Sequence, residues 1–143
     1  MKNLISKIID LRFVLGKFSM VGLSGILVNQ GMLILLHQLF DVNIKYAGII
    51  AIELSIISNF MLNNFWTWQK GLSDGFCLRF LKYHLVTLFS GGFNYGTLLL
   101  LTSLNIHYFI ANLIGIGIGM VINFIINHNW TFKIQEVTSD ATK

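Results

Sequence analysis

A run of fifty consecutive residues, 83–132, contains no Asp, Glu, Lys or Arg. A second uncharged run covers the 23 residues 18–40. The hydrocarbon core of a bilayer is about 30 Å thick and is crossed by about 20 helical residues. The long run therefore holds two spans and the short run holds one, so the sequence predicts an integral membrane protein.

The composition agrees with this interpretation. Charged residues make up 11% of the chain, against about one quarter in ordinary soluble domains. The expected fold is all-α, with four transmembrane helices near 18–39, 46–68, 83–104 and 108–130. The corresponding segments are a basic N-terminal segment (1–17), a first pair of spans (18–68), a middle loop (69–82), a second pair of spans (83–132) and a tail (133–143).

Basic residues are concentrated on one side of these spans. Nine of the ten Lys and Arg residues lie in 1–17, 69–82 and 133–143, whereas the other side has only Lys45. Because an excess of Lys and Arg in short loops marks the cytoplasmic side, both termini and the middle loop are expected in the cytoplasm. The net charge of +4 then reflects topology and attraction to anionic membrane lipids, and not a nucleic-acid partner.

The basic N-terminal segment is amphipathic. Apolar residues gather on one side of a helix drawn over residues 3–17, and polar residues gather on the other. This pattern fits an interfacial helix on the cytoplasmic leaflet. A frayed basic tail is the alternative, and the pattern does not choose between the two.

One motif occurs twice in the chain. The pattern N-F-x-x-N-x-x-W-T, followed by an aromatic residue, stands at 59–68 and again at 123–132, a separation of 64. Ala47 matches Ala111 at the same separation, and Asn29 matches Asn94 at 65. The sequence therefore predicts a duplicated helical hairpin. Since each unit has two spans, the two repeats should be parallel and related by an axis along the membrane normal.

These features resemble the GtrA-like family over about residues 12–132. They are the four spans, an Asn in the middle of spans one and three, and the repeated ending, in which Trp68 departs slightly as an aromatic residue other than Phe. Members are small membrane proteins of cell-surface polysaccharide synthesis and teichoic acid glycosylation. The resemblance implies a multi-pass protein of the cytoplasmic membrane that translocates a polyprenyl-phosphate-linked sugar.

Polar residues form a stripe along the second and fourth predicted spans. The stripes consist of Ser55, Asn59, Asn63 and Trp66, and of Asn112, Gly119, Asn123, Asn127 and Trp130. Amides in hydrocarbon need partners, so two interpretations stay open: they bond neighbouring helices, or they line a path and bond sugar hydroxyls. Under the second interpretation the substrate-binding amides are Asn29, Asn94, Asn59, Asn63, Asn123 and Asn127.

Charged residues supply the remaining candidates. Glu53 is the only acidic residue inside a predicted span; it can bind a proton and couple transport to a gradient, or pair with a basic residue such as Lys45. Lys17, Arg79 and Lys82 lie at the cytoplasmic mouths of spans one and three. These three can hold the phosphate of a lipid-linked sugar, or serve only as topology determinants.

No pattern typical of an enzyme or a metal site is present in the sequence. The four His residues are scattered without ligand spacing, and there is no P-loop, no G-x-S-x-G and no pair of neighbouring carboxylates. We therefore expect a non-enzymatic protein without metal or cofactor. Rival hypotheses are an accessory or anchoring subunit of a membrane glycosyltransferase and a small proton-coupled exporter. Because four spans enclose little space, a homodimer or a complex with the transferase is expected.

Overall fold

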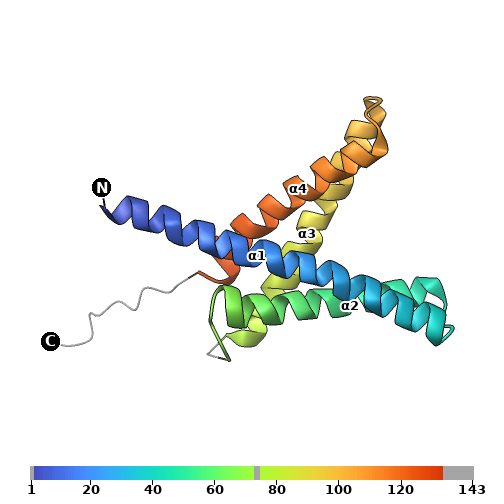
Figure 1. Ribbon diagram of the computed structural model, residues 1–143, viewed down its shortest axis with the longest axis horizontal. Helices are drawn as coiled ribbons and strands as arrows, with labels where there is room; N and C mark the ends of the chain where they lie inside the picture. The colour runs from blue at the N-terminus through green and yellow to red at the C-terminus, as the bar shows by residue number, and fades with distance from the viewer. Residues whose placement is uncertain (1, 73–74, 134–143) are drawn as a thin grey trace. The chain divides into compact units, whose positions relative to one another are not determined.

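The computed structural model describes residues 2–72 and 75–133, and four long α-helices dominate this part of the chain (Figure 1). Three of them are extended at their C-terminal ends by a π-helical turn. The elements in chain order are α1 (Lys2–Ile34), η1 (Leu35–Leu39), α2 (Ile44–Leu62), η2 (Asn63–Thr67), α3 (Phe76–Ser103), α4 (Tyr108–Ile126) and η3 (Asn127–Thr131).

All four helices are long and apolar enough to cross a membrane. The candidate spans are Asp10–Leu39, Ile44–Thr67, Phe76–Ser103 and Ile110–Thr131. The prediction of an all-helical protein with four candidate spans is confirmed. The duplication and the orientation in the membrane stay predictions.

Two helices begin earlier than the sequence suggested. Helix α1 continues without a break from Lys2 through the basic segment, so the described part of 1–17 is helical and joined to the first span. Helix α3 begins at Phe76, so Arg79 and Lys82 lie on its first two turns and not in a loop. For α1 the amphipathic pattern over residues 3–17 had left a helix as one of two interpretations, whereas for α3 hydrophobicity alone missed the basic N-terminal turns. Whether residues 2–17 lie at an interface stays a prediction.

The chain divides into two compact units, and the boundary falls inside α3. The first unit runs to Thr87 and the second begins at Leu88. We call α1 and α2 the first hairpin. The second hairpin is α4 together with α3 from Leu88 onward.

The first unit is built on close packing of α1 against α2 (Figure 1). Ala47 and Ala51 of α2 are completely buried, because small side chains let two helices approach closely. Nearer the end of α2, the ring of Phe60 lies at the centre of an aromatic cluster from α3, with ring centroids 5.0–5.6 Å away. Its members are Phe76, Phe80 and Tyr83.

Residues with a left-handed backbone conformation and one side-chain cap shape the turns between the helices. Asp41, Gln69 and Asn105 adopt φ angles of 52°, 51° and 61°, the region in which Asn and Asp are favoured among non-glycine residues. The side chain of Asn43 accepts a hydrogen bond of 3.0 Å from the backbone N–H of Lys45, which caps α2. These short polar connections end the helices without any proline.

The two copies of the sequence motif end in the same local structure. In η2 the backbone N–H of Trp68 donates to the carbonyl of Asn63 at 2.9 Å, and in η3 that of Phe132 donates to Asn127 at 2.9 Å. Bonding from i to i+5 widens the turn. The next buried side chain after Asn63 on this face is therefore Thr67, which is 5% exposed, and not Trp66, which is 41% exposed. The predicted stripe wrongly assumed regular α-helix up to Trp66.

Trp130 was misplaced by the same assumption. It lies in η3 and is 47% exposed, whereas its neighbour Thr131 is 4% exposed. The polar stripe of the fourth span therefore continues inward at Thr131 and not at Trp130.

Candidate functional site

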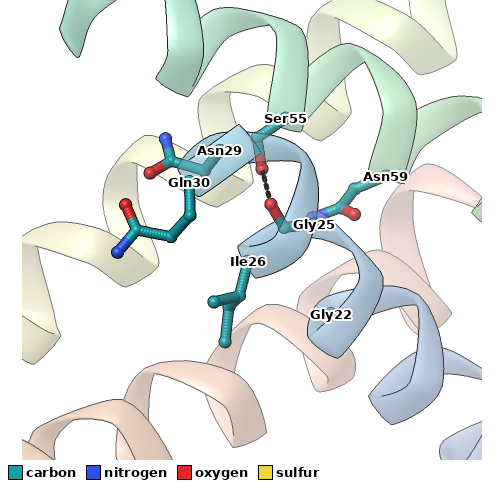
Figure 2. Close-up of a pocket in the computed structure, with 7 residues that line it drawn as sticks. All are labelled: Gly22, Gly25, Ile26, Asn29, Gln30, Ser55 and Asn59. Atoms are coloured by element: carbon teal, nitrogen blue, oxygen red, sulfur yellow. Dashed lines mark hydrogen bonds between the residues drawn. The ribbon is translucent and has the colours of Figure 1, made fainter. Parts of the chain in front are cut away.

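A shallow polar pocket of about 320 Å³ lies between α1 and α2 (Figure 2). It is at mid-length of the hairpin, since Ser55 stands near the middle of the candidate span Ile44–Thr67. The lining residues are Gly22, Gly25, Ile26, Asn29, Gln30, Ser55 and Asn59. Four of these seven residues have a side chain that ends in an amide or a hydroxyl, which is unusual for a surface at membrane depth.

Gly25 brings the two helices together at the floor of the pocket. Ser55 Oγ donates a hydrogen bond of 2.8 Å to the Gly25 carbonyl, drawn as a dashed line in Figure 2. A Cβ at Gly25 would lie 2.3 Å from Asn59 Nδ2, so glycine is needed for this approach. Ser55 therefore bonds α2 to α1. This is the interpretation in which polar residues of the stripe bond neighbouring helices.

The Asn59 side-chain oxygen lacks a hydrogen-bond partner among the described residues. This atom, Oδ1, is buried and accepts no hydrogen bond from them. An unpaired buried acceptor costs about 1–3 kcal/mol, so this atom needs a further donor. Because the atom is buried, a donor in the adjoining pocket reaches it only after the Asn59 side chain turns.

Asn29 and Gln30 lie side by side on the pocket wall, with both amides projecting from α1 (Figure 2). Neither side chain makes a hydrogen bond, ion pair or ring contact with another residue of 2–72 or 75–133. The sequence analysis named Asn29 and missed Gln30, because Gln30 has no counterpart in the repeat: Tyr95 stands at the matched position.

The amide side chains of the second hairpin have different surroundings. Asn94 is packed against α4, where a Cβ at Gly115 would lie 2.5 Å from Asn94 Oδ1. That oxygen is buried and has no hydrogen-bond partner in the described part of the chain. Asn123 accepts a hydrogen bond from Asn127 Nδ2 within α4 and η3. Neither Asn94 nor Asn123 lines the pocket.

Asn63 belongs to the interior of the first unit. It is 1% exposed, donates to the Tyr83 hydroxyl at 2.9 Å through Nδ2, and accepts from Thr67 Oγ1 at 2.8 Å through Oδ1. Asn127 is likewise buried. The geometry of Asn63 is that of a structural link between α2 and α3.

The basic residues gather around the turn between α2 and α3. Arg79 Nε donates to Asn64 Oδ1 at 3.1 Å, and a terminal nitrogen of Arg79 donates to the Gly71 carbonyl at 3.1 Å. Lys70, which the sequence analysis counted only among the basic residues that set the topology, joins this group: burial lowers the pKa of its ammonium, and the nearby Arg79 guanidinium lowers it further. Arg79 is thus fixed in orientation by the turn.

Lys17 and Lys82 complete the set of predicted cations. Lys17 Nζ donates to the Trp66 carbonyl at 3.4 Å and lies 5.5 Å from the centroid of the Trp66 ring. Lys82 lies half-buried on α3. Lys17 therefore joins α1 to η2.

Glu53 pairs with His84 and not with Lys45. His84 Nε2 lies 3.0 Å from Glu53 Oε1 and 3.2 Å from Oε2, which links α2 to α3 within the candidate spans. The sequence analysis considered the histidines only as metal ligands and so missed this pair. Among residues 2–72 and 75–133 no three His, Cys, Asp or Glu side chains gather as a metal site.

Four apolar helices with a polar pocket at mid-length define a multi-pass membrane protein. Residues 17–132 match the family described as "GtrA/DPMS, transmembrane domain", and the chain belongs to that family. The family predicted from the repeated motif is confirmed.

A relative extends this comparison. The chain is 41% identical over 116 residues to a dolichol-phosphate mannosyltransferase of Pyrococcus furiosus. The match covers 81% of this chain and 33% of that protein, so the chain spans about a third of the relative's length.

Proposed function

We propose that this protein moves a polyprenyl-phosphate-linked sugar across the cytoplasmic membrane, to supply glycosylation of a surface polysaccharide or teichoic acid. The observation that carries the proposal is the pocket at mid-length of the first hairpin, with the amides of Asn29 and Gln30 on its walls (Figure 2). Amides both donate and accept, so they can replace the water that surrounds sugar hydroxyls. The polyprenyl chain stays in lipid.

The phosphate is assigned to the basic end of the first unit. Arg79 supports this role because Asn64 and Gly71 hold its side chain in place, and a guanidinium fork suits phosphate oxygens. Lys82 and Lys17 add positive charge. Replacing Arg79 by Lys keeps the charge and removes the fork, so a phosphate role predicts slower transport by the variant, whereas a topology determinant predicts no change.

The arrangement in the membrane forms part of the proposal. Both termini and the middle loop face the cytoplasm, and the two hairpins are parallel repeats. Support comes from matched features at a separation of 64: the π-helical turns η2 and η3, and the buried pairs Phe60 with Phe124 and Thr67 with Thr131. No chemical step is assigned to the chain itself.

Transport is tested in liposomes. Purified protein is reconstituted with a polyprenyl-phosphate hexose, and exposure of the hexose to an impermeant oxidant is followed over time. Faster exposure than in protein-free liposomes supports the proposal. Equal rates under imposed proton and ion gradients contradict it.

A second function is favoured by the relative, in which a similar segment forms a third of a mannosyltransferase. In that case this chain anchors or activates a membrane glycosyltransferase and moves nothing. Deletion of the protein would then abolish transferase activity in membranes. The rate at which the lipid-linked sugar crosses the bilayer would not change.

A further inference from the structure

We propose that the sugar binds at one site only, in the first hairpin, and that Gln30 is its specificity-determining residue. This inference rests on the proposed function and deepens it. The ligand class is a neutral, polyhydroxylated head group, a hexose on a lipid phosphate. The argument compares the environments of amides at matched positions in the two hairpins.

In the second hairpin the amide oxygen of Asn94 is buried. Asn94 is packed against the backbone of α4 because position 115 is glycine: a Cβ there would lie 2.5 Å from Asn94 Oδ1 and 2.7 Å from the Asn94 carbonyl oxygen. A Cβ at Gly119 would lie 3.1 Å from the Ser90 carbonyl oxygen. The helices therefore approach closely at Gly115 and Gly119, and Asn94 Oδ1 is buried against α4.

The first hairpin differs at that position by one methyl group. Ala51, completely buried, stands where Gly115 stands in the second hairpin, 64 residues on. In the second hairpin, the absence of a Cβ at Gly115 lets Asn94 approach α4. In the first hairpin the Ala51 methyl fills the matched place, so Asn29 cannot pack against α2 in the same way. Asn29 lies on the wall of the open pocket instead. Ala51 is thus a positioning residue that acts through Asn29.

Gln30 adds the feature by which the pocket can select a ligand. Two neighbouring amides, on Asn29 and Gln30, present up to four donor hydrogens and two acceptor oxygens (Figure 2). A site that hydrogen-bonds hydroxyls rejects ligands lacking them, because its own polar groups are then left unpaired. The matched Tyr95 cannot substitute for Gln30, because its polar atom is a single hydroxyl.

The test measures binding to the purified full chain in detergent. The probes are short-chain polyprenyl phosphates bearing glucose, galactose or mannose, and the same lipid phosphate without sugar. The variants are Gln30→Leu, similar in size without the amide, and Ala51→Gly, which lets Asn29 pack inward. Tyr95→Leu is the control at the matched position of the second hairpin, and thermal unfolding confirms that each variant is folded.

We expect the wild-type protein to bind at least one hexose lipid more tightly than the bare lipid phosphate. Gln30→Leu should weaken hexose binding about tenfold, the loss of roughly one hydrogen bond, and leave the bare lipid unaffected. Ala51→Gly should reduce the preference for hexose, and Tyr95→Leu should keep it. Equal binding of all probes to the wild-type protein, or equal effects of Gln30→Leu and Tyr95→Leu, overturns the inference.

This result is separable from that of the transport assay. If the protein binds the hexose through Gln30 but liposomes show no accelerated movement, the site stands and the translocation proposal fails. If movement is fast, and Gln30→Leu binds and moves the hexose lipid as the wild-type protein does, the proposed function stands and the single-site inference fails.

Discussion

The Asn59 amide lies directly against Gly25 of the neighbouring helix, where a Cβ would come within 2.7 Å of three Asn59 side-chain atoms. The Ser55 hydroxyl bonds the carbonyl of the same glycine. The contact fixes the distance between α1 and α2 at the height of the pocket. It combines a small residue with a polar bond between helices, as is common among membrane helices.

Gly25→Ala should therefore destabilise the protein. The methyl must displace Asn59, whose Cγ is also too close, and overpacking of this kind costs about 1–3 kcal/mol. Gly48→Ala on α2 is the control, because a Cβ there meets no atom within 4 Å. Thermal unfolding in detergent should show a lower midpoint for Gly25→Ala and an unchanged or higher one for Gly48→Ala. Equal midpoints would show that the helices separate freely here.

Tyr83→Phe should weaken the link between α2 and α3. The change removes the hydroxyl that accepts from Asn63 Nδ2 and leaves a buried donor unpaired, which costs about 1–3 kcal/mol. The double variant Tyr83→Phe with Asn63→Leu should lose less than the sum of the two single changes, because the Asn63 Nδ2 donor that Tyr83→Phe leaves unpaired is then absent. The Thr67 hydroxyl loses its Asn63 acceptor in both variants that lack Asn63, so this loss cancels in the comparison. Strict additivity in equilibrium unfolding would mean that the bond contributes nothing to stability.

Glu53 and His84 form the candidate for proton coupling. If their shared site takes up and releases a proton during transport, Glu53→Gln should abolish any acceleration by a proton gradient while slow, gradient-independent movement remains. Lys45→Gln is the control, because Lys45 is not the partner of Glu53. Liposomes with and without an imposed pH difference provide the measurement. A gradient response that survives in Glu53→Gln assigns the pair a structural role only.

Cys77 reports the orientation of the chain. It is exposed at the start of α3, next to the turn that the distribution of Lys and Arg predicts in the cytoplasm. A membrane-impermeant maleimide should label it only after the cells are opened, and Cys77→Ala should give no signal. Labelling in intact cells would reverse the predicted orientation.

The membrane class and the family could be predicted from the sequence, because uncharged runs and a spaced motif are properties of single segments. Contacts between helices could not. Nothing in the periodicity indicated that His84 meets Glu53, since that contact depends on how α2 and α3 are rotated about their axes. Gln30 was missed for a related reason: the search followed what the two halves share, and Gln30 is a place where they differ.

The π-helical turn η2 has a consequence for length as well as for shape. A π turn holds one residue more than the α-helical turn it replaces, so deleting Phe65 would let the end of α2 rewind as ordinary helix. Rewinding without the deletion would instead bring Trp66 toward the buried place that Thr67 fills, where an indole has no room. The extra residue of the π turn is therefore what keeps Thr67 buried and Trp66 exposed at the end of the first repeat.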